Sequence, residues 1–337
     1  NKSNRRIQSS LPRLLEWIPP YGLLETVLHK WLFAYKLCVW CYFVTFSYYF
    51  ILFMFSFRKN PNSGQEIIFG GSDDIYKTNL VKSKPTKFLI HGWTCEASSP
   101  FNVAVKDALD VNVIVIDWSW AAQSVYPIAC GYVYSTGVLV ASAMDWLLEK
   151  GLSIENMHIV GHSLGAHVAG TAARSIKRGR IPYLTGLDPA MPGWHYYTCR
   201  ITPNDADYVE VIHTSTMGLG EPLGHNDFFP NYPWGQPGCH PIDPSPSHNR
   251  AWELFACSLD NKRFKASQCY NYGDLFFGSC ATGVQLHMGG SKPKSNTNPL
   301  SIYLYLTLSG PLVGSIDKDS IAFFRYHSLA CLQIAHE

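Results

Sequence analysis

Five short apolar runs recur between residues 87 and 214, and their spacing constrains the fold more than any other feature of the sequence. The runs are KFLIHG, VNVIVIDW, NMHIVGHS, IPYLTGLD and YVEVIHT, at residues 87–92, 111–118, 156–163, 181–188 and 208–214. Each run is continuous rather than alternating, which is typical of strands buried on both faces of a parallel sheet. The stretches at 137–151 and 163–179 suit helices, and each ends in a glycine, Gly151 or Gly179, as a helix C-terminus favours. The alternation predicts an α/β fold, with a mostly parallel central sheet flanked by helices.

The composition supports a chain with a large buried core. Of the 337 residues, 47% are hydrophobic and 15% are charged, which excludes a disordered or fibrous protein. The 27 basic and 25 acidic residues leave a net charge of +2, so nucleic acid is not an expected partner. Ten cysteines favour an oxidising compartment. Because the sequence has neither a His/Cys cluster with zinc-ligand spacing nor a glycine pattern that cradles phosphate, we expect no cofactor.

An uncharged apolar run lies near the N-terminus, at residues 37–57. It has 21 residues, and about 20 apolar residues span a bilayer. Six Lys or Arg against two Glu precede it, which would keep the N-terminus cytosolic. Three interpretations stay open: a signal anchor or uncleaved signal region, a buried strand with a core helix, or sequence that does not belong to the mature protein. The third is suggested by 13 aromatic residues among the 27 from Trp31 to Phe57.

Ser163 lies between two glycines in HIVGHSLGAHVAG, residues 158–170. It follows a predicted strand and opens a predicted helix, which is the setting in which G-x-S-x-G forms a nucleophile elbow. The missing side chains of Gly161 and Gly165 would let the strand and the helix approach closely around a strained serine backbone. The alternative is a glycine-rich turn that contains a serine by chance, but the strand–turn–helix context favours catalysis.

A catalytic serine needs a base, and the base needs an acid to orient it. In this kind of fold the chain order is serine, acid, histidine, and Asp188, which ends a predicted strand 25 residues after Ser163, is the favoured acid. The competing carboxylates are Asp117, which precedes the serine, and Asp205, Asp207 and Asp227, which follow it. Eight histidines follow Asp188. His213, at a strand end, and His248, in a loop before an amphipathic stretch, cannot be separated by pattern alone.

Seven segments together resemble the pancreatic lipase family. They are FLIHGW (88–93), VIVIDWS (113–119), HIVGHSLGAHVAG (158–170), TGLDPA (185–190), DADYVEVIHT (205–214), LGHNDFFPN (223–231) and QPGC (236–239). The resemblance runs in order from about Phe55 to Pro311 and implies a single α/β-hydrolase domain at residues 55–311. Residues 1–54 and 312–337 would then be atypical flanking segments. Because 26 residues follow Pro311, we expect no C-terminal β-sandwich of the kind that pancreatic lipases carry.

The resemblance also implies a serine hydrolase site. It makes Ser163 the nucleophile, Asp188 the acid and, from the context SHNRA, His248 the base. The main-chain N–H groups of Trp93 and Leu164 would form the oxyanion hole. Leu164 follows directly from the elbow geometry, and Trp93 follows from the HGW that ends an early strand. The expected reaction is the hydrolysis of lipid acyl esters.

Residues 222–249 are rich in proline, and we expect loops there rather than regular elements. In the family a lid separates the cysteine of PGC from the catalytic histidine, and here it would have eight residues: His240, Pro241, Ile242, Asp243, Pro244, Ser245, Pro246 and Ser247. So short a lid, with a short loop after His213, is similar to the phospholipase A1-like members, which release the sn-1 acyl chain of phospholipids. The alternatives are a triacylglycerol or galactolipid lipase, or a catalytically weak lipid-binding or storage relative.

The resemblance bears on the cysteines as well. Cys269 and Cys280 match a disulfide of the family. The lid disulfide of the family lacks its second cysteine here, because Pro246 stands at that position. Cys239 is therefore expected to be unpaired, or joined to an unusual partner such as Cys257.

Some members of the family bind calcium near the segment that here reads CRITPNDA, residues 199–206. Arg200 and Asp205 remain, but Thr202 occupies a ligand position that is usually aspartate, so we expect no metal. The expected partner is a lipid substrate at a membrane, lipid-droplet or micelle interface, without an obligate protein partner. The enzyme would be secreted, or else anchored in a membrane through residues 37–57.

Overall fold

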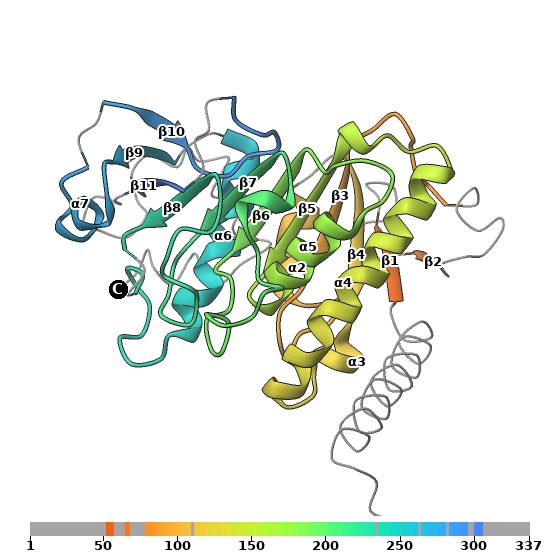
Figure 1. Cartoon of the computed structure of the whole chain (residues 1–337), viewed down its shortest axis with the longest axis horizontal. Coiled ribbons are helices and arrows are strands. Elements are labelled where there is room, and N and C mark those ends of the chain that lie inside the picture. Colours follow the sequence, from red (N-terminus) through yellow and green to blue (C-terminus); the bar gives the residue numbers. More distant parts are fainter. Residues whose placement is uncertain are drawn as a thin grey trace, which may run out of the picture. The chain divides into compact units, whose positions relative to one another are not determined.

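An eleven-stranded sheet organises the part of the chain that the computed structural model describes (Figure 1). That part comprises residues 52–56, 65–67, 78–108, 111–232, 235–261, 264–280, 283–295 and 300–305. The strands are β1 (Leu52–Ser56), β2 (Gln65–Ile67), β3 (Thr86–Ile90), β4 (Asn112–Asp117), β5 (Met157–His162), β6 (Tyr183–Leu187), β7 (Tyr208–Ile212), β8 (Asn226–Pro230), β9 (Lys265–Cys269), β10 (Gln285–His287) and β11 (Ser301–Tyr305). Across the sheet their order is β10-β9-β11-β8-β7-β6-β5-β3-β4-β1-β2.

The centre of the sheet is parallel, as the continuous apolar runs predict. β3 pairs in parallel with β4 and β5, and parallel pairing continues through β6, β7 and β8 to β11. The outer strands β1, β2, β9 and β10 are added in antiparallel pairs. All five predicted strands are present, and the α/β-hydrolase arrangement that the resemblance implies is confirmed.

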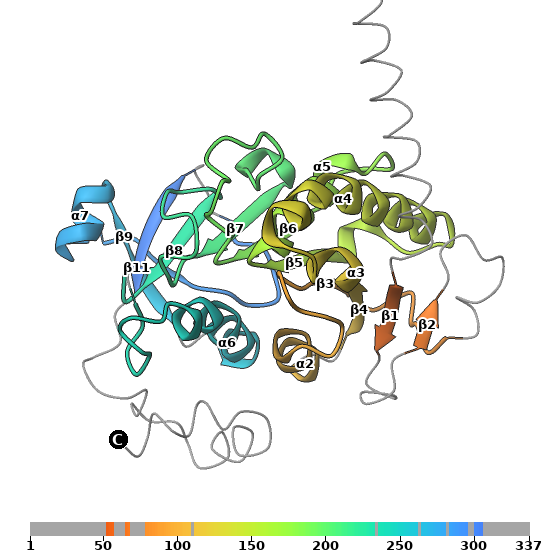
Figure 2. The same ribbon diagram turned by 90° about the horizontal axis from the view of Figure 1, so that it is seen from below.

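Helices cover both faces of this sheet (Figure 2). They are α2 (Pro100–Asp107), α3 (Ser119–Ala122), α4 (Tyr126–Glu149), α5 (Leu164–Ser175), α6 (Ser245–Asn261) and α7 (Tyr272–Phe277), with short 3-10 turns η2 (Ile154–Asn156) and η3 (Pro203–Asp205). α4 and α5 lie on one face, and α2 and α6 lie on the other (Figure 2). Successive side chains of β3 alternate between the two cores: Phe88 and Ile90 pack toward α4 and α5, and Leu89 packs toward α2 and α6.

The two predicted helices are present with different limits. The helix predicted at 137–151 begins earlier, at Tyr126, because Pro127 occupies the first turn, where its missing N–H costs no hydrogen bond. Gly151 stands directly after the C-cap with φ +93°, as expected for a helix end. α5 ends at Ser175, so Gly179 lies beyond the helix terminus and does not cap it.

The expectation of loops throughout 222–249 is wrong at two places. Residues 226–230 form β8, a short buried strand between β7 and β11, although NDFFP contains three residue types that disfavour strands. α6 begins at Ser245, so the last part of this segment is helical. Asp243 Oδ1 accepts the Ser245 N–H at 2.9 Å, and proline is tolerated at such a helix start, which is why Pro246 does not prevent the helix.

The described residues all belong to the second of two compact units, residues 50–337. β1 includes residues 52–54, which the sequence analysis placed in the N-terminal segment, and it pairs antiparallel with β4. The rest of the apolar run at 37–57, on which the expectation of an anchor rests, lies outside the described residues. Residues 306–337 also lie outside them. By length and hydropathy α4 could cross a membrane, but 56% of that window is buried inside the fold, as in a core helix.

Candidate active site

Ser163 occupies the sharp turn between β5 and α5, as the sequence predicts. Its backbone has φ 56° and ψ −123°, a conformation that is strained for a residue with a side chain. The neighbouring strand holds the turn in place, because the Ser163 N–H donates to Leu187 O at 2.9 Å and Ser163 O accepts from Ala190 N–H at 3.2 Å. The serine is thus fixed at the carboxyl end of the central strand.

The glycines around Ser163 are required by close packing. A Cβ atom on Gly165 would lie 2.3 Å from Ile90 O, and one on Gly161 would lie 2.3 Å from Gly165 O. A Cβ atom on Gly92 would lie 2.9 Å from the Ser163 Cβ. The first turn of α5 therefore rests directly on the end of β3, and the predicted close approach of strand and helix is observed.

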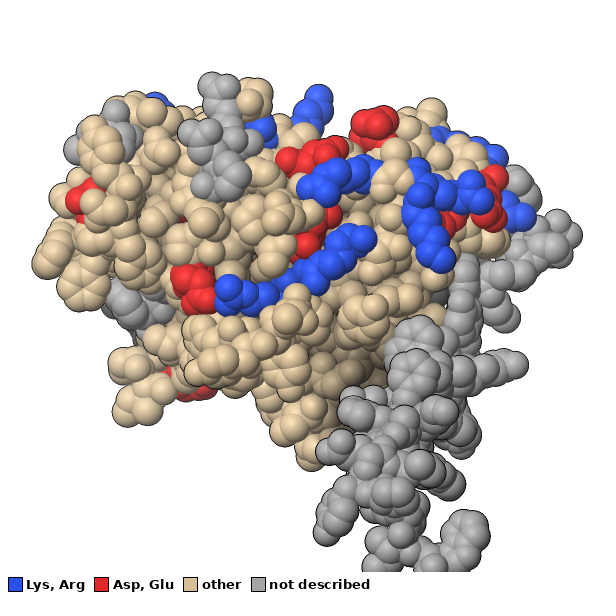
Figure 3. Space-filling view, in the orientation of Figure 1, with Lys and Arg blue, Asp and Glu red and all other residues tan. Residues whose placement is uncertain are grey.

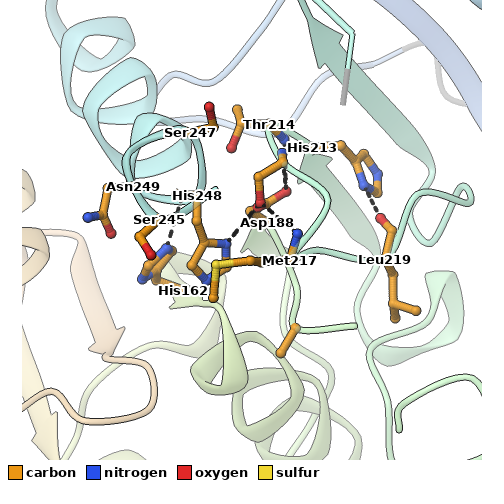
Figure 4. Close-up of polar contacts among 12 residues, drawn as sticks. His162, Asp188, His213, Thr214, Met217, Leu219, Ser245, Ser247, His248 and Asn249 are labelled. Carbon is orange, nitrogen blue, oxygen red and sulfur yellow. Dashed lines mark hydrogen bonds and ion pairs between the residues drawn. The ribbon is translucent and has the colours of Figure 1, made fainter. Parts of the chain in front are cut away.

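Asp188 and His248 form a buried acid–base pair (Figure 4). Asp188 directly follows β6 and is completely buried, and its Oδ2 lies 2.6 Å from His248 Nδ1. With the carboxylate ionised, Nδ1–H is the donor, which leaves Nε2 as the acceptor. His248 lies in the first turn of α6, not in a loop as predicted, and its N–H donates to Pro244 O at 2.9 Å.

His213, the other candidate base, is engaged elsewhere. Its Nε2 lies 2.9 Å from Asp227 Oδ1, and its Nδ1 lies 2.7 Å from Leu219 O. Both His213 and Asp227 are completely buried. This pair fixes the loop between β7 and β8, so the tertiary structure separates the two histidines that the sequence pattern could not.

The other competing carboxylates also have partners away from Asp188. Asp117 contacts His91 at 3.3 Å, Asp205 contacts Arg174 at 2.8 Å and Asp207 contacts Arg180 at 2.8 Å. Hydrogen bonds from His91 and Ser119 hold the pKa of Asp117 at about 2, although burial alone would raise it. Of the carboxylates considered from the sequence, Asp188 is the one that pairs with His248.

The segment after β7 supplies contacts to Asp188 that the sequence analysis missed. Thr214 N–H and Ser215 N–H donate to Oδ1 at 2.8 and 3.3 Å, and Ser215 Oγ lies 2.5 Å from Oδ2. Neighbouring parallel strands end at the same edge of a sheet, and β6 and β7 are such neighbours. That adjacency is the signal that could have pointed to the two residues.

His162 connects the serine turn to the helix that carries His248. The two imidazole rings have centroids 4.7 Å apart, and His162 Nε2–H donates to the His248 main-chain oxygen at 3.3 Å. Burial holds the pKa of His162 well below its ordinary value, so it stays neutral. The hydrogen bonds of the described residues do not include one between Ser163 Oγ and His248, so the proton transfer between them stays a prediction.

The two proposed oxyanion donors lie beside the serine turn. Leu164 is the first residue of α5, and Trp93 follows Gly92, which packs against Ser163. The Trp93 side chain is fixed by its Nε1–H, which donates to Ser124 O at 2.8 Å, and by an edge contact with Tyr126. Among the hydrogen bonds found in the described ranges, none uses the main-chain N–H of Trp93 or Leu164.

The eight-residue lid divides into two parts. Residues 240–244 are irregular, whereas residues 245–247 belong to the first turn of α6. Ile242 is 85% exposed. A cavity of about 290 Å³ lies along the lid, and it is lined by Thr216, Gly235, Gln236, Cys239, His240, Pro241, Ile242, Pro244 and Ser247. The lid thus borders a cavity that reaches the residue next to His248.

The disulfide implied by the resemblance is present. Cys269 at the end of β9 is joined to Cys280, which follows α7. Cys239 carries a thiol that lies 3.6 Å from the Arg250 guanidinium. In the described part of the chain it is not joined to Cys257, the unusual partner considered for it.

The calcium-binding segment of the family has a different cation here. Arg174 donates through Nε and Nη2 to both oxygens of Asp205 at 2.8 Å, and through Nη2 to Arg200 O at 2.5 Å. Its Nη1 lies 3.4 Å from Thr198 O. The carboxylate and carbonyl oxygens that a cation would need already accept hydrogen bonds from a guanidinium, so these residues do not fit a bound metal.

Comparisons with known proteins identify the family of the chain. A family model described as Lipase matches residues 46–308. Lipoprotein lipase of Rattus norvegicus is 40% identical over 205 residues, which cover 55% of this chain and 43% of that protein. Lipoprotein lipase of Homo sapiens is 37% identical over 205 residues, which again cover 55% of this chain and 43% of that protein. The chain spans less than half the length of these curated relatives.

Solved structures that match parts of the chain include Est1E and EstE5. Est1E from Butyrivibrio proteoclasticus, with ferulic acid bound, has a TM-score of 0.32 and 13% identity, and the match covers 50% of this chain and 77% of that one. EstE5 soaked with ethyl alcohol has a TM-score of 0.25 and 16% identity, with coverages of 33% and 38%.

Proposed function

The chain belongs to the lipase family, and on that premise we propose that it is a carboxylic ester hydrolase that releases acyl chains from lipids. The observation that carries the proposal is the 2.6 Å contact between Asp188 Oδ2 and His248 Nδ1 beside the strained turn of Ser163. A strained serine turn and a buried acid–base pair at one edge of the sheet are the parts that acyl transfer needs.

In the proposed mechanism Ser163 Oγ attacks the ester carbonyl carbon while His248 Nε2 accepts the serine proton. The main-chain N–H groups of Trp93 and Leu164 stabilise the oxyanion. Collapse of this intermediate breaks the bond to the alcohol, which takes the proton from His248. Water, deprotonated by His248, then attacks the acyl-enzyme, and the fatty acid leaves as Ser163 regains its proton. Asp188 holds the imidazole and stabilises its protonated form throughout.

The proposed substrate is a phospholipid, cleaved at the sn-1 position. Support comes from the lid, which has eight residues between Cys239 and His248, of which three are folded into α6. A lid this short covers little of the cleft and leaves room for a polar head group. The second candidate is triacylglycerol, because the curated relatives at 37–40% identity are named lipoprotein lipases.

An apolar surface supports action at a lipid interface. Val125 and Ile128, at the start of α4, are 64% and 52% exposed, and Tyr126 between them contacts the ring of Trp93. Lys and Arg gather on the upper right of the face drawn in Figure 3 and in a band across its middle, whereas the lower part of that face, around the start of α4, shows few charges. A lipid surface of low charge could therefore approach the site from this side.

We propose that the enzyme acts outside the cell. The Cys269–Cys280 disulfide supports an oxidising compartment. Attachment to a membrane through residues 37–57 is the alternative, and carbonate extraction of the full chain from membranes separates the two.

The substrate proposal is tested by acyl release from the full chain. sn-1-labelled phosphatidylcholine and trioleoylglycerol are presented in matched mixed micelles, and Ser163→Ala serves as the control. Faster release from phosphatidylcholine supports the phospholipase A1 activity, and faster release from trioleoylglycerol replaces it with the second candidate. Activity on neither substrate would favour a lipid-binding relative that has lost catalysis.

A further inference from the structure

Ser215 contacts both members of the acid–base pair. Its Oγ lies 2.5 Å from Asp188 Oδ2 and 3.5 Å from His248 Nδ1, and the residue is 2% exposed. Oδ2 is also the oxygen that accepts the Nδ1–H of His248 at 2.6 Å. A hydroxyl group and an imidazole therefore share one carboxylate oxygen inside the protein.

The surrounding contacts define where the Ser215 proton lies. Met217 N–H donates to Ser215 Oγ at 3.1 Å, so the hydroxyl oxygen acts as an acceptor on that side. His248 Nδ1 donates to Asp188 and has no lone pair left to accept a second proton. The Ser215 O–H must therefore donate to Asp188 Oδ2, and the 3.5 Å approach to His248 is a contact rather than a hydrogen bond.

The main chain of the same segment holds the other carboxylate oxygen. Thr214 N–H and Ser215 N–H donate to Asp188 Oδ1 at 2.8 and 3.3 Å. The segment packs tightly here, because a Cβ atom on Gly218 would lie 2.4 Å from Oδ1. Oδ1 is thus held by two amides, whereas Oδ2 is held by one hydroxyl and by the histidine that it must orient.

We propose that Ser215 is a positioning residue of this site, an inference that rests on the proposed hydrolase function. Its hydroxyl fixes the rotation of the Asp188 carboxylate so that Oδ2 stays directed at His248. It also takes up part of the negative charge on Oδ2, which would otherwise act on the imidazole alone. Without the hydroxyl, the carboxylate turns more freely and stabilises protonated His248 more strongly.

The chain offers a matched control for the loss of a buried hydroxyl. Ser258 is 1% exposed, its Oγ donates to Phe255 O at 2.6 Å, and it accepts from Gly290 N–H at 2.9 Å. Ser258→Ala therefore removes one donor and one acceptor contact, as Ser215→Ala does, but none to a carboxylate. The conservative variant Ser215→Thr keeps the hydroxyl at the site itself.

The experiment measures kcat/KM of the full chain for p-nitrophenyl butyrate between pH 5 and pH 9. Ser215→Ala is expected to lower kcat/KM about 10-fold and to move the acidic limb of the profile to higher pH. The other imidazole that faces His248 belongs to His162, and burial holds its pKa well below the ordinary value. Ser215→Thr is expected to restore the profile, and Ser258→Ala is expected to leave it unchanged.

Two outcomes overturn the inference. One is a profile of Ser215→Ala that matches the wild type in height and position. The other is an equal loss in Ser215→Ala and Ser258→Ala without a shift of the acidic limb, which would mean a structural role alone. If the wild-type chain itself neither hydrolyses the ester nor reacts with a fluorophosphonate, the proposed function has failed and not the assignment of Ser215.

Discussion

His162 and His248 pack ring against ring, with centroids 4.7 Å apart, and the Nε2–H of His162 donates to the main-chain oxygen of His248. The residue before the candidate nucleophile is therefore hydrogen-bonded to the candidate base. Ser163 directly precedes α5, and His248 lies in α6 on the opposite face of the sheet. The contact between His162 and His248 is therefore a direct connection between the two halves of the site.

Replacing His162 is expected to loosen that connection. His162→Phe keeps an aromatic ring against His248 but removes the donor to its carbonyl. We expect kcat/KM for a soluble ester to fall about 10-fold, with an unchanged circular dichroism spectrum. Steady-state kinetics measure the loss, and full activity in this variant would show that the hydrogen bond does not position the base.

The packing of the serine turn predicts a large effect of one methyl group. A Cβ on Gly165 would lie 2.3 Å from Ile90 O, which is main chain and cannot turn aside. We expect Gly165→Ala to lower the free energy of unfolding by about 3 kcal/mol. The control is Gly131→Ala within α4, where a Cβ meets nothing within 4 Å.

In the control, alanine is expected to raise the free energy of unfolding by about 0.5–1 kcal/mol. Urea denaturation measures both variants at one pH. Equal stabilities for Gly165→Ala and Gly131→Ala would contradict the close approach of α5 to β3.

The ion pair between Arg174 and Asp205 is expected to stabilise the folded protein without a metal ion. Asp205 is 2% exposed and would lose its cation in Arg174→Met. We expect the free energy of unfolding to fall by about 2 kcal/mol, whereas Arg180→Met should cost about 0.5 kcal/mol. Arg180 and its partner Asp207 are both half exposed, which makes this pair the matched control.

Thermal unfolding with and without a chelator distinguishes the ion pair of Arg174 and Asp205 from a calcium site. Thermal unfolding of the wild type is expected to have the same midpoint in EDTA and in millimolar calcium, because the oxygens of Asp205 are already occupied. A midpoint that rises with calcium would show that a cation competes with Arg174.

A buried lysine predicts how stability depends on pH. Lys87 is 1% exposed, its Nζ lies 2.6 Å from His158 Nδ1, and burial lowers its pKa from 10.5 to about 7. Burial and the nearby charges of Lys87 and Lys294 hold the pKa of His158 well below its ordinary value, so His158 stays neutral. Between pH 7 and pH 10.5 the unfolded chain binds a proton at residue 87 that the folded chain does not.

The free energy of unfolding therefore contains a term that rises with pH in this window, by at most about 1.4 kcal/mol per pH unit. Lys87→Met should remove that term. Urea denaturation of both proteins at pH 7, 8 and 9 measures the two slopes. Parallel slopes would mean that Lys87 keeps its proton in the folded protein.

Much of the fold could be predicted because the central strands contain consecutive apolar residues, such as Phe88, Leu89 and Ile90 in β3. β8 could not be predicted, because its sequence NDFFP contains residues that are typical of turns. The segment forms a strand because it pairs with β7 and β11. The start of α6 could not be predicted from pattern either, because its prolines are typical of a loop.

At the site, the local sequence pattern predicted the turn at Ser163 and favoured Asp188 among the candidate aspartates. It could not choose between His213 and His248, because their carboxylate partners are set by the tertiary fold. Ser215 was missed for the same reason, since it lies 27 residues from Asp188 and 33 from His248. Such contacts depend on which strand ends meet, and a local sequence pattern does not contain that information.

The most direct test of the account is the site of covalent labelling by a fluorophosphonate. The full chain is treated with the probe, digested, and the modified residue is identified by mass spectrometry. We expect the label on Ser163, its loss in Ser163→Ala, and much slower labelling in His248→Asn, because the asparagine cannot accept the serine proton. Labelling of another residue, or equal labelling of the wild type and Ser163→Ala, would contradict the assignment of Ser163 as the nucleophile.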